Sequence, residues 1–172
     1  MNRPQASEHH EYYGKYIKKV PDGDIIRLLE EQVEETLALL EGIPSGQADH
    51  RYAPDKWSIK DVVGHVIDTE RTFAYRALCF ARKDPAQLPS FEQDQYAEFS
   101  NAANRTLQDL AEELRVVRKS HVVLFKSFDE ASWTRRGIAS GFEFSVRALP
   151  YIIAGHEIHH RQVLEERYLP IS

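Results

Sequence analysis

The chain has 172 residues, a length that suits one compact domain with a single core. Its formal net charge is -5 with acidic and basic residues interspersed, which argues against the clustered positive surface of a nucleic-acid binder. No apolar run is long enough to span a bilayer, the N-terminus lacks a secretion-type apolar segment, and the one cysteine excludes an internal disulfide. We therefore expect a cytoplasmic protein, with one domain over residues 1–172, that contacts neither membrane nor nucleic acid.

Four helices are predicted in a helical core of about residues 20–168, separated by segments rich in glycine and proline. They are expected over residues 23–41, 58–82, 98–128 and 145–167. At the start of the second, Ser58 and Asp61 have the spacing of a capping box. Early in the fourth, Pro150 removes a backbone hydrogen bond, which predicts a kink or a later start.

The third predicted helix carries the clearest pattern, because its apolar residues alternate spacings of four and three. This is the seam of a helix bundle, so the predicted class is an all-α four-helix bundle. The link over residues 83–97, between the second and third helices, is long enough to be a crossover and to cover the mouth of a pocket. The segment GFEF near Gly141 can pair locally with a neighbouring strand.

The last predicted helix contains two histidines, His156 and His160, that lie one turn apart and project from the same side. At about 100° per residue, the direction of this pair is within roughly 60° of an apolar stripe. The stripe consists of Leu149, Ile152, Ile153, Val163 and Leu164. Two neighbouring imidazoles buried in apolar surroundings need partners, and a shared metal ion supplies them. Hydrogen bonds from other helices are the alternative.

A metal bound by this pair needs a third ligand, and His65 on the second predicted helix is the best candidate. The helix face around it is polar and carries Asp68, Thr69 and Arg76, so a solvated surface is an equally good interpretation of the pattern. We expect Thr69 at the pocket. Asp68 is the candidate for orienting a ligand or carrying a proton, and Arg76 for meeting an anionic substrate. A surface ion pair is the simpler alternative for both.

Two further histidines are candidates for positions around the metal. His121 occupies a seam position in the third helix, where a single histidine is usually packed or hydrogen-bonded, and it can also line the pocket. His159 is offset by about 60° from the ligand pair, so it can support a ligand from outside.

Two other metal-site patterns match the same pentapeptide, HEIHH. One is the His-Glu-x-x-His helix of zinc proteases, in which Glu157 would be the general base. Only 12 residues follow His160, too few for the downstream ligand usual in that class. The other is one half of a di-iron carboxylate site, but no second Glu-x-x-His occurs on a predicted helix. We rank both below a three-histidine site.

Three segments together resemble the DinB-like superfamily of metal-binding bundles: YAPDKWSIKDVVGHVIDTERTFAYRALCFAR, LPSFEQDQY and SVRALPYIIAGHEIHH. The resemblance covers most of the chain. It implies a four-helix bundle, often a homodimer, that holds one zinc or nickel ion on three histidines from two helices. Position by position, the ligands of the family fall on His65, His156 and His160.

The superfamily includes bacillithiol transferases and a mycothiol-dependent isomerase, and many members are described as metal-dependent hydrolases. Three histidine ligands leave an open coordination position, which is the arrangement of a catalytic site. We therefore predict an enzyme that activates a thiol or a water and acts on a small molecule, for instance a low-molecular-weight thiol. The alternative is a non-catalytic binding module with a structural metal.

Overall fold

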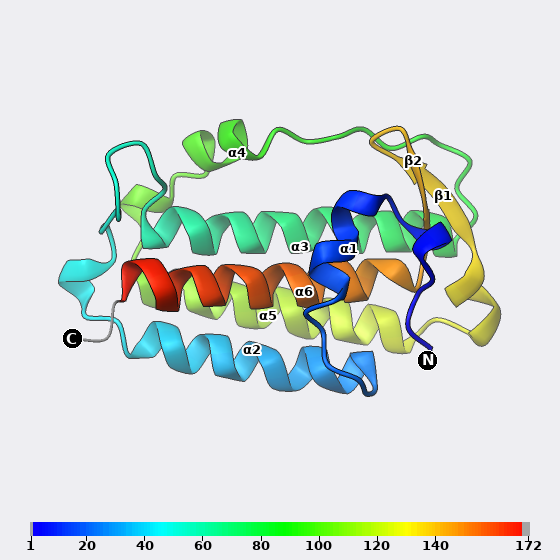
Figure 1. Cartoon of the computed structure of the whole chain (residues 1–172), viewed down its shortest axis with the longest axis horizontal. Coiled ribbons are helices and arrows are strands. Elements are labelled where there is room, and N and C mark those ends of the chain that lie inside the picture. The colour runs from blue at the N-terminus through cyan, green and yellow to red at the C-terminus, as the bar shows by residue number, and fades with distance from the viewer. Residues whose placement is uncertain (1, 170–172) are drawn as a thin grey trace.

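The computed structural model describes residues 2–169. Its four long helices are α2 (Ile25–Glu41), α3 (Ile59–Ala81), α5 (Leu107–Lys126) and α6 (Ala148–Val163), shown in Figure 1. Two short helices are α1 (Glu11–Ile17) and α4 (Gln93–Phe99), and an antiparallel hairpin of β1 (Arg136–Ala139) and β2 (Phe142–Ser145) lies at one end. The predicted four-helix bundle is confirmed, and GFEF does pair locally. No helix in the described part of the chain is both long and apolar enough to cross a membrane.

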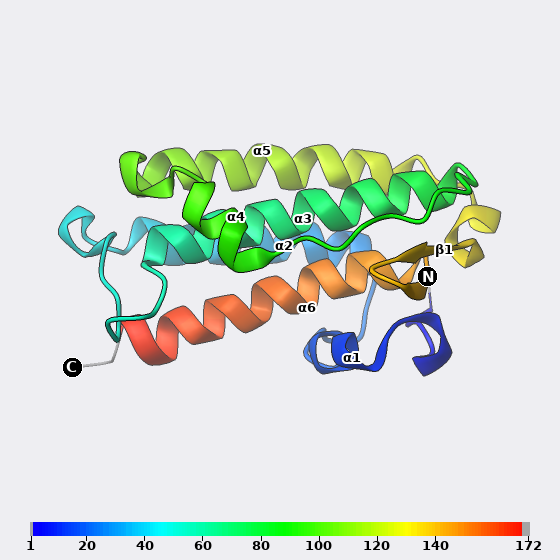
Figure 2. The same cartoon turned by 90° about the horizontal axis from the view of Figure 1, so that it is seen from above.

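Two pairs of consecutive bundle helices, α2 with α3 and α5 with α6, lie on opposite corners. Helix α2 contacts α5 and α6, and α3 contacts the same two helices. Figures 1 and 2 show α3 and α2 on one diagonal and α5 and α6 on the other. Helices α3 and α5 run in the same direction, so the chain between them returns along the bundle (Figure 2). The link predicted to be long enough for a crossover is therefore a crossover.

The ends of the helices follow local signals in the sequence. The Asp24 side chain caps α2 by accepting a hydrogen bond from the backbone N–H of Ile26. Ser58 and Asp61 form the predicted capping box at the start of α3. Helix α6 begins late, at Ala148, so Pro150 lies in its first turn, where a missing N–H is tolerated.

The third predicted helix is divided, which corrects the expected range of 98–128. Its first residues belong to the end of α4, a short 3-10 turn follows, and α5 begins only at Leu107. Asn101 has a φ of 59°, in the left-handed region that interrupts a helix. The Thr106 side chain then accepts a hydrogen bond from the N–H of Asp109 and caps α5. The alternating apolar pattern predicted for this helix begins at Ala103, which is exposed.

The N-terminal segment folds onto the bundle, and helix α1 was not expected from the sequence. Arg147, just before α6, donates two hydrogen bonds to the buried carboxylate of Glu8, over 2.7 Å and 2.5 Å. Helix α1 then packs on α6 (Figure 2). A Cβ on Gly155 would lie only 2.1 Å from the Tyr16 carbonyl oxygen, so glycine is required for this close approach.

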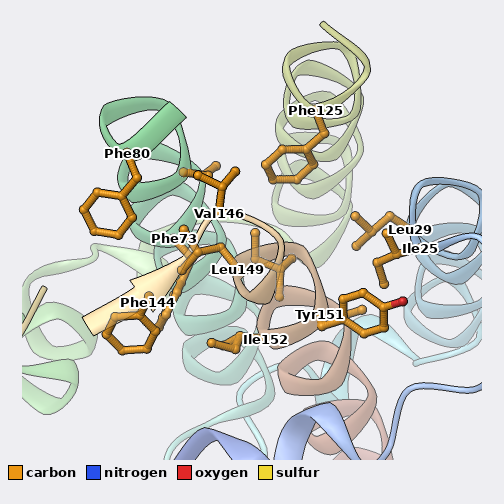
Figure 3. Close-up of a cluster of buried hydrophobic side chains, with 14 of the residues drawn as sticks. Ile25, Leu29, Phe73, Phe80, Phe125, Phe144, Val146, Leu149, Tyr151 and Ile152 are labelled. Atoms are coloured by element: carbon orange, nitrogen blue, oxygen red, sulfur yellow. The ribbon is translucent and has the colours of Figure 1, made fainter. Parts of the chain in front are cut away.

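The bundle interior contains two apolar clusters with a polar layer between them. Figure 3 shows the cluster at the hairpin end, where side chains of α2, α3, α5, β2 and α6 meet. The second cluster fills the other end. On α2, α3 and α5, the change from one cluster to the other falls at a buried polar side chain, namely Gln32, Glu70 and Arg118. On α6, the buried Glu157 lies one residue before Ile158, the last residue of the hairpin-end cluster on that helix.

Candidate metal centre

Three histidine side chains meet between α3 and α6, which pack against each other. The Nε2 atom of His156 lies 3.0 Å from Nε2 of His65 and 3.1 Å from Nε2 of His160. Each of the three residues can offer a ring nitrogen, all within 4.8 Å of one another. The one-turn spacing of the α6 pair turns both rings toward α3, while His65 reaches the same point about two turns after the Ser58 cap.

Burial keeps the three imidazoles neutral. It lowers the pKa of His65 to about 4 and, together with the neighbouring histidines, that of His160 to about 3. Burial also holds the pKa of His156 well below its usual value. A neutral ring nitrogen carries either one proton or one in-plane lone pair, so Nε2 of His156 cannot form good hydrogen bonds with both neighbours at once. As a protein-only cluster, the three rings are incompletely satisfied.

This donor set fits a divalent cation. Histidine nitrogens bind zinc at about 2.0–2.1 Å, so two ligands of one ion lie no more than about 4.2 Å apart. The two separations from His156 are well inside that limit. Imidazole also suits zinc and nickel among the common metals. In addition, Nδ1 of His160 is buried and has no hydrogen-bond partner among the described residues.

Aromatic rings pack around the three histidines. The ring centre of Trp57 is 4.7 Å from that of His65, and the ring centre of Tyr16 is 5.4 Å from that of His156. His159 lies beside the group, with its ring centre 5.0 Å from that of His160. These contacts fix the ring planes and limit the access of water.

A pocket of about 110 Å³ opens beside His65 and His156. Its walls come from α1, α3, the crossover with α4, and α6. It is lined by Tyr12, Tyr13, Tyr16, His65, Thr69, Phe73, Phe91, Gln93, Ile152 and His156. Phe91 and Gln93 lie within the link predicted over residues 83–97, so the crossover does cover one side of the pocket. A larger cavity of about 220 Å³, lined by Leu40, Lys60 and Leu107 among others, contains no histidine.

Of the candidates Asp68, Thr69 and Arg76 on α3, only Thr69 lines the pocket, and Arg76 is buried next to it. Thr69 lines the pocket as expected, and its buried Oγ1 atom has no hydrogen-bond partner among the described residues. The surface alternative is wrong for Arg76, which is 2% exposed. Its Nη2 atom donates hydrogen bonds to the Pro89 carbonyl at 2.8 Å and to Ser140 Oγ at 3.0 Å.

Two other candidates lie away from the three histidines. Asp68 is half-buried and lines pockets on the α4 side, with Ser100, instead of the pocket beside His65. Burial raises the pKa of its carboxyl. Nδ1 of His121 lies 3.2 Å from Oε1 of Glu70, in the polar layer of the bundle. The structure brings neither residue to the pocket.

The polar layer is an extended hydrogen-bond network that includes the neighbour of a candidate ligand. Arg118 donates to both Glu70 oxygens at 2.9 Å and to Glu157 Oε2 at 2.6 Å. Glu157 also accepts hydrogen bonds from Thr36 and Gln32. Burial opposes ionisation of Glu70, but Arg118 and His121 outweigh it and hold its pKa below the usual value. Glu157 is therefore part of this buried network, which argues against the general-base role that the protease pattern would give it.

The contribution of α1 to the pocket was not predicted. The three tyrosines of α1 occur in a polar segment with no clear helical stripe. One feature of the sequence indicates that a segment packs here. Gly155 lies next to His156 inside a helix, and a glycine in a helix often marks the close approach of another backbone.

The fold and this geometry define a four-helix bundle whose second and last long helices carry a three-histidine group with the donor set of a metal site. The sequence profile of the DinB superfamily matches residues 28–164. The chain therefore belongs to the DinB superfamily. No curated protein sequence matches it significantly.

Two solved structures share the fold. One is described as "YfiT from Bacillus subtilis is a probable metal-dependent hydrolase with an unusual four-helix bundle topology". It is 17% identical with a TM-score of 0.71, and the match covers 96% of this chain and 90% of that one. The other is a mycothiol-dependent maleylpyruvate isomerase, 9% identical with a TM-score of 0.67, and the match covers 84% of this chain and 61% of that one.

Proposed function

We propose that this protein is a metal-dependent enzyme in which His65, His156 and His160 bind one divalent cation. The observation that carries the proposal is the meeting of three neutral Nε2 atoms that cannot satisfy one another. The three ligands leave a coordination position for a small molecule from the adjacent pocket. Zinc or nickel is the proposed ion.

The reaction proposed is thiol transfer or hydrolysis. When bound, such an ion supplies the Lewis acidity that lowers the pKa of a thiol or a water. The chain itself holds the three rings, packs Tyr16 and Trp57 around them, and presents the Thr69 hydroxyl to the bound molecule. Asp68 lies on the other flank of α3, so we assign it no step in this pocket. The descriptions of the two similar structures support a metal-dependent reaction on a small molecule.

Elemental analysis of the purified protein tests the metal ligands. We expect about one divalent ion per chain in the wild type, and a large loss in His65→Ala, His156→Ala and His160→Ala. His50→Ala is the matched control, because His50 is exposed in the loop before α3. Equal metal content in all of these proteins would contradict the site.

Turnover by the metal-loaded protein tests the enzyme class. Thiol-transfer and hydrolysis assays should show activity that is lost on chelation while the fold, followed by circular dichroism, survives. Full occupancy without turnover in either assay would favour the non-catalytic binding module. Unfolding on chelation would favour a structural metal. The homodimer and the cytoplasmic location stay predictions.

A further inference from the structure

Arg76 carries a buried positive charge with no counter-charge. No carboxylate among residues 2–169 lies within ion-pair distance of it, whereas the other fully buried arginine, Arg118, pairs with Glu70 and Glu157. Its Nη2 atom is used by two neutral acceptors, and Nη1 is buried without a partner in the described chain. A guanidinium stays protonated even when burial lowers its pKa. An anion from outside the chain would complete this site.

Arg76 does not line the pocket beside the histidines but packs against Phe73 of its wall. His65, Thr69 and Phe73 are spaced by four residues on α3, and all three line the pocket. At about 100° per residue, Arg76 projects between the directions of His65 and Thr69, further along the same helix. The centre of its guanidinium is 4.9 Å from the centre of the Phe73 ring.

The other side of Arg76 is also formed by neighbours of the pocket. It lies beside the hydroxyl of Tyr13, and Tyr13 lines the pocket. The carbonyl of Pro89, which accepts a hydrogen bond from Arg76, is two residues before Phe91 of the pocket wall. Tyr13 and the segment that carries Phe91 therefore belong both to the pocket wall and to the surroundings of Arg76.

The Thr69 hydroxyl is a second unsatisfied group on the same stripe. Thr72, on the same helix, donates its hydroxyl hydrogen to the carbonyl four residues earlier, at 2.9 Å. Thr69 does not use this local partner, although its Oγ1 is buried. Two groups on this helix face therefore lack a partner in the described chain. They are the Thr69 hydroxyl in the pocket and the Nη1 group of Arg76 beside Phe73.

We propose that the pocket binds a small carboxylate, with its anionic group on Arg76, its middle beside Thr69, and its reacting end at the three histidines. A carboxylate accepts the N–H groups of an arginine in charge-assisted hydrogen bonds, which are about twice as strong as neutral ones. The position of the reacting end rests on the proposed function, whereas recognition of the carboxylate by Arg76 does not.

Matched pairs of small thiols test the inference. Protein loaded with cobalt(II) is titrated with mercaptopropionate and mercaptopropanol, and with mercaptohexanoate and mercaptohexanol. Binding is followed by the cobalt absorption spectrum and, separately, by the melting temperature. We expect the acid to bind roughly tenfold or more tightly than the alcohol for at least one chain length. Arg76→Gln should remove this difference, and Arg27→Gln, an exposed arginine, should keep it.

The possible outcomes separate this inference from the proposed function. If acids and alcohols change the cobalt spectrum with equal affinity, the inference fails and the metal centre stands. If the acids raise the melting temperature through Arg76 without changing the spectrum, the proposed function fails and the inference stands. An acid preference that persists in Arg76→Gln also overturns the inference. If that variant does not fold, the wild-type comparison of acid with alcohol still decides.

Discussion

Two clusters of buried polar side chains both include residues of α3 and α6. They differ in whether the described chain supplies hydrogen-bond partners for all of their polar atoms. The first is the polar layer around Arg118, and the second is the three-histidine group. They are adjacent in sequence, since Glu157 belongs to the layer and His156 to the histidine group. His65 and His156 are buried, as are the carboxylates of the polar layer, so burial alone does not explain the difference.

The polar layer is complete without any ligand. Both carboxylates have charged or neutral hydrogen-bond donors, and Nη1 of Arg118 donates to the Leu29 carbonyl at 2.8 Å. The histidine group is incomplete, with three ring nitrogens crowded together and unpaired atoms at His160 and Thr69. A complete cluster holds helices in register, and an incomplete one indicates a binding site.

The largest expected effect on stability comes from removing the arginine at the centre of the polar layer. Arg118→Met leaves two buried carboxylates without their cation, so we expect a loss of about 3–5 kcal/mol in the free energy of unfolding. Urea denaturation measures it. The control is Arg115→Met on the same helix, where exposed ion pairs should contribute less than about 1 kcal/mol. Equal losses in the two variants would show that the layer is not a distinct structural element.

Binding of a metal ion to the histidine cluster should instead raise the free energy of unfolding. Zinc added at a free concentration of 100 times its Kd should stabilise the wild type by about 2.7 kcal/mol, because only the folded chain presents the three nitrogens together. The melting temperature should therefore rise with zinc in the wild type and stay constant in His156→Ala. A zinc-dependent rise in that variant would mean that the ion binds elsewhere.

The metal-free protein should also show a pH dependence of its stability. The folded-state pKa values of His65 and His160, about 4 and about 3, lie below the 6.5 of an unfolded histidine. The unfolded chain therefore takes up protons first as the pH falls through 6.5. The stability present at neutral pH should fall by about 1.4 kcal/mol per pH unit for each histidine, down to about pH 4. Urea midpoints measured from pH 7 to 5 check this slope, which should be smaller in His65→Ala.

The sequence predicted the parts of the fold that depend on local patterns. Helix α3 and its capping box followed from Ser58 and Asp61, and the late start of α6 followed from Pro150. The pairing of His156 with His160 needed only the helical repeat. The position of His65 was ambiguous from its helix alone, because a polar helix face is equally typical of solvent and of a pocket.

Features that depend on tertiary contacts were missed. The predicted range of the third helix, 98–128, included Asn101, where the backbone turns left-handed. Helix α1 is too short to form by itself, and it is held by the contacts at Gly155 and Glu8. The burial of Arg76 was not foreseen, because it comes from the crossover and the hairpin, which contribute Pro89 and Ser140.

The diagonal placement of α2 against α3, and of α5 against α6, has a consequence for folding kinetics. In an up-and-down bundle, each helix can form a hairpin with the next, so early contacts are local in sequence. Here the partners of α2 are α5 and α6, and the partners of α3 are the same two helices. Lateral pairing therefore requires closure of long loops, and this bundle should fold more slowly than an up-and-down bundle of equal length and stability.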